Sequence, residues 1–300
     1  MDYDLFDLYE FVWPVARGGH KWITGVTLFE DMRHSGDATN GDKGENRATG
    51  WLPRPFLMPI TMNDEEVRAT YPLRELKGRL HREFARTPPT LEGIKKFADE
   101  FGLLGGDIGE TPVVDVGGPH SPIGPGEGFS DWAVEISRMA EAVEFWDLAR
   151  KNDTKRLSDL IHWREDSVAL KLAIGYRPIA ASNFRTDLFE QVQPGDLVEP
   201  AMFVVQEIVN DHLSNKARAG PRLLWDVKQR TLSQRVTPKA LIGAIWLDFL
   251  LAIDGNTDYR PCLRCDAPFP VTPKGQRRKF CSDRCRVAHH RKKRNQGGSP

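Results

Sequence analysis

The segment ALIGAIWLDFLLAI, residues 240–253, is the longest apolar run in this chain of 300 residues. Thr237 precedes it in a position suited to capping a helix, and Pro238 suits the first helical turn. The polar segment DGNTD, which starts at Asp254, then breaks the pattern. The sequence therefore predicts a helix buried in the core, and the only charged residue in it is Asp248.

The composition favours a soluble globular protein. The run at 240–253 has 14 residues and contains a carboxylate, so it is too short and too polar to span a bilayer. The chain starts with MDYDLFDLYEFVW, which is acidic where a secretory signal would be basic. A content of 40% hydrophobic and 28% charged residues is sufficient for a sizeable core. We therefore expect a cytoplasmic protein.

Together with the apolar run, the patterns upstream of it predict a mainly helical α+β body over residues 1–255. Thr90 is placed to cap a helix that stops at Gly102, and Ser130 a long helix over residues 131–151. The long helix has an apolar stripe typical of a core contact, made of Trp132, Ile136, Met139, Val143 and Trp146.

Residues 105–128 include eight glycines and four prolines and are interpreted as a mobile loop. A phosphate-binding loop is the other interpretation of such a glycine-rich segment. It is disfavoured because neither GxxxxGK[ST] nor a GxGxxG between a strand and a helix is present.

The charges are distributed unevenly. Residues 260–294 carry 12 Lys and Arg against two Asp, a net charge of +10, so the rest of this neutral chain carries −10. All four cysteines lie in the same basic segment. Because thiols inside a cell stay reduced, four clustered cysteines are interpreted first as a metal site.

The cysteines follow the pattern Cys262-x2-Cys265-x15-Cys281-x3-Cys285. A CxxC pair on a tight turn brings two sulfurs to one ion, and four thiolates complete a tetrahedron. Such a site is closed and structural, and the predicted ion is Zn²⁺. An iron–sulfur centre and unliganded thiols are the alternatives.

The residues around the second pair predict a helix that begins between its two cysteines, since Ser282 and Asp283 are good capping residues. Between the pairs, strand-like residues flank a PKGQ turn and predict a hairpin. Knuckle, hairpin and helix in this order predict a treble-clef-like module over residues 256–295, followed by a disordered tail at 296–300. His289, four residues after Cys285, is the alternative fourth ligand, but four cysteines already suffice.

The cations around the cysteines predict a surface for phosphate backbones. The candidate nucleic-acid-binding residues are Arg277, Arg278, Lys279, Arg284, Arg286, Arg291, Lys292, Lys293 and Arg294. DNA is favoured over RNA as the partner. The alternative is a protein-interaction or structural module, in which zinc only folds the tail and the cations dock on an acidic partner or on the body. We expect no enzyme, because acids and histidines such as His162 form no recognisable constellation.

The segments CLRCDAPF at 262–269 and KFCSDRCRVAHHRKKR at 279–294 resemble the C-terminal zinc module of bacterial CGNR-type zinc-finger proteins. The resemblance covers about 35 residues, and the four cysteines match that family's ligands. Residues 285–288 read Cys-Arg-Val-Ala where the family has Cys-Gly-Asn-Arg. The resemblance implies a DNA-binding transcriptional regulator, with a helical sensing body that binds an unidentified small-molecule effector.

Overall fold

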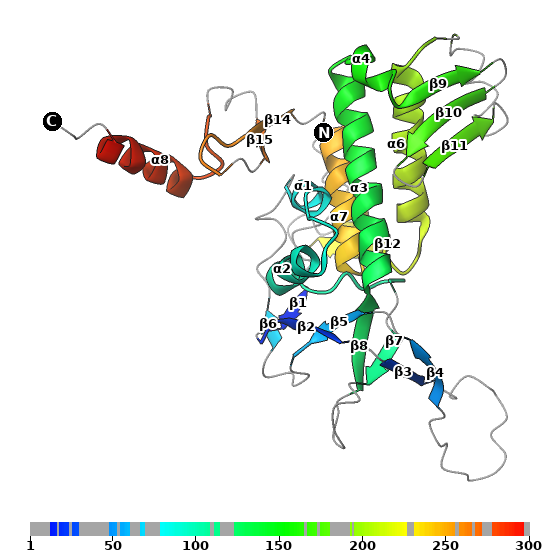
Figure 1. Ribbon diagram of the computed structural model, residues 1–300, viewed down its shortest axis with the longest axis vertical. Coiled ribbons are helices and arrows are strands. Elements are labelled where there is room, and N and C mark those ends of the chain that lie inside the picture. The colour runs from blue at the N-terminus through cyan, green and yellow to red at the C-terminus, as the bar shows by residue number, and fades with distance from the viewer. Residues whose placement is uncertain are drawn as a thin grey trace. The chain divides into compact units, whose positions relative to one another are not determined.

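The computed structural model in Figure 1 describes most of the chain. The described residues are 13–16, 18–23, 26–29, 48–52, 55–60, 67–69, 79–108, 111–114, 123–164, 167–172, 175–180, 193, 195–226, 231–255, 258–265, 268–271 and 278–296. The chain forms two compact units, each built from three segments. Unit 1 comprises Met1–Glu75, Thr87–Glu135 and Ala217–Ala244, and unit 2 comprises Leu76–Arg86, Ile136–Lys216 and Ile245–Pro300. The elements are helices and small antiparallel sheets, which confirms a mixed helix-and-sheet protein.

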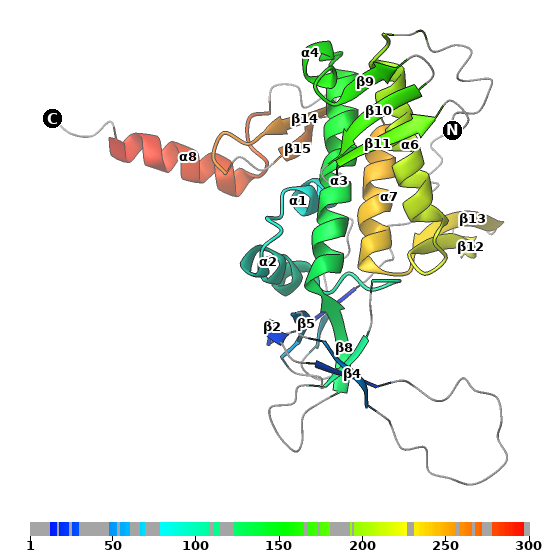
Figure 2. The same ribbon diagram turned by 45° about the vertical axis from the view of Figure 1, so that its right-hand side comes forward.

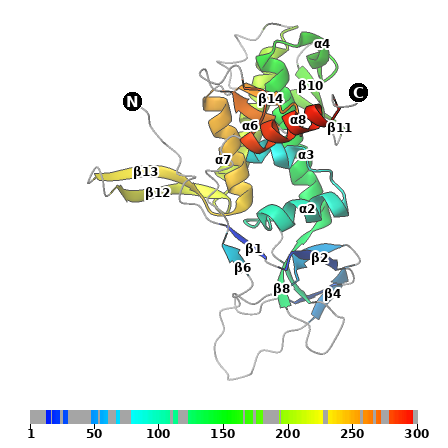
Figure 3. The same ribbon diagram turned by 90° about the vertical axis from the view of Figure 1, so that its left-hand side faces the viewer.

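Unit 1 contains a six-stranded antiparallel sheet and two two-stranded ones. The large sheet has the order β2 (His20–Ile23), β5 (Phe56–Pro59), β8 (Ile123–Gly128), β7 (Thr111–Val114), β3 (Val26–Phe29) and β4 (Ala48–Leu52). The small sheets pair β1 (Pro14–Ala16) with β6 (Val67–Ala69), and β12 (Ala219–Asp226) with β13 (Thr231–Pro238). Figure 3 shows β12 and β13 as a long two-stranded ribbon.

Strands β7 and β8 lie within residues 105–128, where the sequence predicts a mobile loop. The two pair with each other, Val114 opposite Ile123, and each also pairs with a strand from elsewhere in the chain, β3 or β5. Pro112 faces Pro125 in the register, so the missing amide donors fall on one rung. Distant strands thus supply partners that the local glycine-rich composition does not reveal.

Helix α2 (Leu91–Phe101) in unit 1 forms as the sequence predicts. The Thr90 side chain accepts a hydrogen bond from the Gly93 backbone N–H at 3.1 Å, which caps the first turn. Gly102 ends the helix with φ of 98°, a left-handed value that favours glycine. Ile94, Phe97 and Phe101 are buried, so the predicted apolar stripe packs into the core.

The apolar segment at residues 240–253 forms α7 (Leu241–Asp254), whose residues from Leu241 to Phe249 are all buried. The predicted start is wrong, because Thr237 and Pro238 end strand β13 instead of capping the helix. The Ile242 N–H donates to the carbonyl of Leu104 at 3.0 Å. A backbone acceptor distant in sequence therefore satisfies an amide of the first turn.

The apolar run contains one glycine, Gly243, because there is no room for a side chain at this position. A Cβ at this position would lie 1.8 Å from the carbonyl oxygen of Arg218, so any larger residue would displace that backbone. The buried Arg218 guanidinium is held by two carboxylates, at 2.5 Å from Asp107 and 3.1 Å from Glu135. The glycine therefore lets α7 approach the segment that carries this ion-paired arginine.

Unit 2 is largely helical. Figures 1 and 2 show the unit 2 portions of α3 (Phe129–Arg150) and α7 beside α6 (Val198–Ser214). The other body elements are α1 (Leu80–Ala85), α4 (Thr154–Leu157) and an antiparallel sheet in the order β11 (Gly175–Ala180), β10 (Ser167–Leu172), β9 (Ile161–Arg164). Trp146 packs edge-on to Phe249 at 5.9 Å between centroids, and Trp246 stacks on His212 at 4.0 Å. The predicted stripe of α3 is buried throughout its length.

The carboxylate inside the apolar segment has a specific partner in unit 2. Asp248 Oδ2 accepts a hydrogen bond from the backbone N–H of His81 at 3.1 Å and lies 2.7 Å from the His81 ring Nδ1. Both side chains are fully enclosed, with exposed fractions of 2% and 0%. The pair joins α1 to the middle of α7.

Several predictions fall on residues that the structure does not describe. These include Arg277, residues 297–300 of the predicted tail, and residues 109–110 and 115–122 of the predicted loop. Over the described ranges, no helix has both the length and the apolar character needed to cross a membrane.

Candidate metal centre

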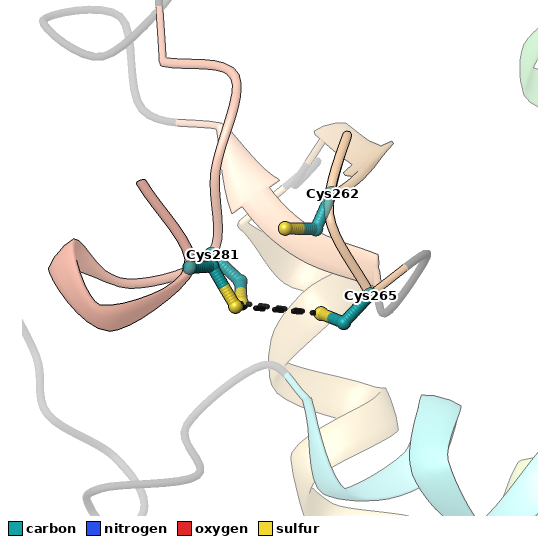
Figure 4. Close-up of side chains that lie close together, drawn as sticks. Cys262, Cys265 and Cys281 are labelled. Atoms are coloured by element: carbon teal, nitrogen blue, oxygen red, sulfur yellow. Dashed lines mark hydrogen bonds between the residues drawn. The ribbon is translucent and has the colours of Figure 1, made fainter. Parts of the chain in front are cut away.

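The first cysteine pair lies in the turn of a small hairpin. Strand β14 (Asp258–Pro261) pairs antiparallel with β15 (Pro268–Val271), with Pro261 opposite Pro268. Cys262 and Cys265 occupy the turn that joins the two strands, and Cys262 is buried. The tight turn aims both sulfurs to the same side, as Figure 4 shows.

The second pair is placed by the start of α8 (Asp283–Gln296). Ser282 Oγ accepts a hydrogen bond from the Cys285 N–H at 3.2 Å, and the Ser282 carbonyl accepts one from Arg286 at 3.1 Å. The predicted helix start between the two cysteines is thereby confirmed. Cys281 stands just before the cap and Cys285 in the first turn, where the positive end of the helix favours a thiolate.

The four sulfur atoms form a compact cluster. All lie within 4.8 Å of one another, and the cysteines form no disulfide. Cys281 Sγ lies 3.6 Å from both Cys265 Sγ and Cys285 Sγ, and Cys285 Sγ lies 3.7 Å from Cys265 Sγ. A tetrahedral ion with metal–sulfur bonds of about 2.3 Å separates its ligands by roughly 3.8 Å. The cluster therefore fits a single metal ion.

Backbone contacts hold the two halves of the cluster together. The Leu263 N–H donates to the carbonyl of Lys279 at 3.1 Å, which ties the first turn to the segment before Cys281. The Arg278 guanidinium donates to the carbonyl oxygens of Phe280, at 2.8 Å, and of Cys281. Its carbon Cζ lies 5.4 Å from the centre of the Phe269 ring. Arg278, predicted as a phosphate ligand, thus helps to hold the cysteine loop.

The hairpin predicted between the two cysteine pairs is described only in part. Its first strand exists as β15, but β15 pairs with β14, which precedes the first cysteine. Residues 278–280, expected in the second strand, have no regular structure, and 272–277 lie outside the described residues. The backbone at Lys279 bonds to the turn at Leu263 instead, because closing the cysteine cluster brings these segments together.

The environment of the thiols favours a cation at their centre. Burial works to raise the pKa of Cys262, but hydrogen bonds from the backbone N–H groups of Cys281, Arg264 and Cys265 outweigh it and lower the pKa to about 6. Burial and the neighbouring cysteines raise the pKa of Cys281 to about 12. Thiolates this close repel one another, so full deprotonation requires a positive ion among them.

His289, the alternative ligand, lies outside the cysteine cluster. Its ring packs against Phe280 at 5.0 Å between centroids, and His290 lies 6.2 Å from the same ring. The metal-ligating group found among the described residues consists of the four cysteines alone. The side chain of His289 therefore contributes to packing on the inner side of α8.

The predicted basic residues fall on two segments. Arg278 and Lys279 precede Cys281, whereas the others that are described lie on α8. The side chains described as exposed are Arg278, Lys279, Arg284, Arg286, Arg291 and Lys292. Lys293 and Arg294 continue the helix. Arg286 Nη2 lies 3.1 Å from Asp283 Oδ1, an ion pair within one helical turn.

Comparisons of the chain with family models, with curated proteins and with solved structures each return no match. The resemblance of the cysteine segment to CGNR-type zinc fingers therefore stays a hypothesis.

Proposed function

We propose that the four cysteines hold one zinc ion in a closed, structural site, and that the module around it binds nucleic acid to regulate transcription. The observation that carries the proposal is the sulfur cluster with a strongly basic helix attached to it. Four thiolates leave no open position for a catalytic water. We assign the protein no enzymatic role, and we place its action in the cytoplasm, where reduced thiols are retained.

The sulfur spacing supports a single zinc ion over an iron–sulfur cluster. Three separations of 3.6 to 3.7 Å match the edges of one small tetrahedron. Bridging sulfides in a multi-iron cluster would hold the cysteine ligands farther apart. The treble-clef description stays part of the proposal, since the knuckle, the helix and strand β15 are present among the described residues, which leave out 272–277.

Zinc content is the first test. We expect one zinc ion per chain by elemental analysis, and loss of this ion when Cys281→Ser removes a central ligand. His289→Ala is the matched control, because it removes the alternative ligand but leaves the cluster intact. Loss of zinc in the histidine variant, or retention in the cysteine variant, would contradict the assignment.

Nucleic-acid binding is the second test. Fluorescence anisotropy of the zinc-loaded full chain with labelled DNA should show affinity that falls steeply with salt. If six or more phosphates are contacted, the loss is about a thousandfold between about 50 and 200 mM salt. Replacing Lys279 and Lys292, two exposed lysines, by Gln should lower the log–log slope by about two. Lys155→Gln, an exposed cation on α4, is the control. Absent or salt-insensitive binding to both DNA and RNA would overturn the proposal.

A protein-interaction module is the second candidate function, favoured by one observation. Leu263, in the turn beside the cysteine cluster, is 60% exposed, and a large apolar side chain on such a loop is typical of a protein contact. In this case the cations would dock on an acidic partner or on the acidic remainder of the chain. Removing residues 1–255 would then strengthen any nucleic-acid binding, whereas the leading proposal predicts no such gain.

A further inference from the structure

We propose that one face of α8, formed by Arg284, Val287, Ala288 and Arg291, reads base pairs in the major groove of double-stranded DNA. The proposal rests on the nucleic-acid binding proposed above. It deepens that function by naming the class of nucleic acid and the residues that would discriminate between sequences. Figure 1 draws this helix in red.

The four residues share one side of the helix. At about 100° per residue, Arg284, Val287, Ala288 and Arg291 fall within an arc of about 100°. Cys285 and His289 lie on other sides, turned to the sulfur cluster and to Phe280. The four line a surface hollow together with Asp283. The metal cluster therefore fixes which side of α8 is turned outward.

The outward face has two kinds of side chain that can contact base edges, namely apolar ones and arginines. Val287 is 44% exposed, which is unusual in a helix whose other outward residues are mostly cations. Apolar side chains such as Val and Ala contact the methyl group of thymine, and arginine binds guanine O6 and N7 with two hydrogen bonds. Arg284 and Arg291 are separated by about 10 Å along the helix axis, or roughly three base pairs of duplex.

The aromatic residues of the module argue against single-stranded partners. Phe269 is 1% exposed, the Tyr259 hydroxyl is buried, and Phe280 packs on His289. Proteins that bind single strands stack bases on exposed aromatic rings, and these rings are turned inward. Double-stranded RNA is disfavoured too, because its deep, narrow major groove does not admit a helix. B-form DNA has a major groove about 12 Å wide, which does.

Asp283, the acidic residue among those that line the hollow, is compatible with the negative charge of DNA. Asp283 Oδ1 lies 3.1 Å from Arg286 Nη2, so its charge is offset within the helix. Arg286 itself lies about 100° from Val287 and about 140° from Arg291 around the helix. Arg284 and Arg286 thus carry the same charge and lie two residues apart, but they are on different faces of the helix. Arg286 therefore provides a matched control for Arg284.

The test selects binding sites for the zinc-loaded full chain from a pool of random double-stranded DNA. We expect a consensus of at least three base pairs that contains guanine. Arg284→Lys keeps the charge but cannot bind guanine with two hydrogen bonds, and should reduce discrimination at one base pair by about tenfold or more. The salt dependence and the zinc content should equal those of the wild type. Val287→Ser should weaken the preference for thymine.

Arg286→Lys is the control and should keep the selected consensus. DNA binding without any selected consensus would overturn the inference while leaving the proposed function in place. Tighter binding to single-stranded or double-stranded RNA, or equal effects of Arg284→Lys and Arg286→Lys, would also overturn it. If no nucleic acid binds at all, the proposed function fails, and this inference fails with it.

Discussion

Asp248 is a carboxylate placed in the middle of the most apolar helix of the chain. It is 1% exposed, and its partner, His81, is completely buried. The cost of enclosing a carboxylate is offset because Asp248 accepts hydrogen bonds from both the His81 backbone N–H and its ring Nδ1. A single polar pair therefore fixes how α1 packs on α7.

The pair makes a prediction about stability. Asp248→Ala leaves two buried donors of His81 without an acceptor and should lower the free energy of unfolding by about 3 kcal/mol or more, measured by urea denaturation. Asp254→Ala, at the exposed end of the same helix, should change it by less than about 0.5 kcal/mol. Similar unfolding midpoints for Asp248→Ala and the wild type would contradict this account.

His20 in unit 1 shows a second contact between a buried histidine and a carboxylate, here the half-buried Asp99. Its ring Nδ1 lies 3.1 Å from Asp99 Oδ1, and the same oxygen accepts a hydrogen bond from the His20 N–H at 2.7 Å. Burial lowers the pKa of His20, and this effect outweighs the opposing influence of Asp99. For Asp99, burial opposes the change, but hydrogen bonds from Lys95 and His20 lower its pKa.

These shifts predict that unit 1 loses stability in acid. Because the unfolded chain protonates His20 more readily than the folded one, the folded state is destabilised as the pH falls below about 6.5. Asp99 adds a loss in the same direction at lower pH, as it becomes protonated. The urea midpoint should therefore drop between pH 7 and pH 5, and drop less in His20→Gln. His162→Gln, at an exposed position, should retain the full drop. An equal drop in both variants would refute the assignment.

At the scale of elements, α8 is a helix that its own sequence stabilises poorly. Its sequence is rich in cations, whose mutual repulsion disfavours an isolated helix. Two features at its start compensate, namely the Ser282 cap and the cluster that contains Cys281 and Cys285. Helix formation and metal binding should therefore be coupled through the first turn.

Ser282→Ala tests this coupling. Loss of the cap should cost about 1 kcal/mol and thus weaken zinc binding roughly fivefold, measured by competition with a chromophoric chelator. Ser282→Asn retains an oxygen acceptor for the Cys285 N–H and should bind zinc much as the wild type does. Unchanged zinc affinity in Ser282→Ala would show that the cap and the metal site are independent.

At the scale of the whole molecule, the cysteine module differs from the body in what stabilises it. Among its described residues from 258 to 296, the buried hydrophobic ones are Cys262 and Phe269, whereas the body has a large aromatic and aliphatic core. A segment with so small a core cannot fold on apolar burial alone. If the cysteines hold the proposed metal ion, its binding would supply much of the folding free energy of the module.

Under the proposed zinc assignment, removal of zinc should therefore unfold the module and leave the body folded. After chelation, trypsin should cleave within residues 260–294, where the Lys and Arg residues are dense, while the buried helices α3 and α7 resist. Re-addition of zinc should restore protection. A zinc-free chain that resists trypsin as well as the zinc-loaded one would show that the module folds without metal.

Much of the local structure of this protein could be predicted from patterns in its sequence. The capping residues Thr90 and Ser282 hydrogen-bond within three residues, and the stripe of α3 repeats with the helical period, so both can be recognised from neighbours in the chain. The cysteine spacing likewise predicted that the four sulfurs lie together, because a short turn suffices to place each pair.

Other features depended on contacts between distant segments, and only the tertiary structure decided them. The glycine-rich segment forms β7 and β8 because β3 and β5 offer unpaired edges, and α7 begins at Leu241 because the Leu104 carbonyl is available. Asp248 could be seen in the sequence as an anomaly, but its partner is 167 residues away. Hydrogen-bond partners that folding brings together from distant segments cannot be recognised in the local sequence. Capping residues, helical periodicity and the spacing of metal ligands can be recognised there, because they involve neighbours in the chain.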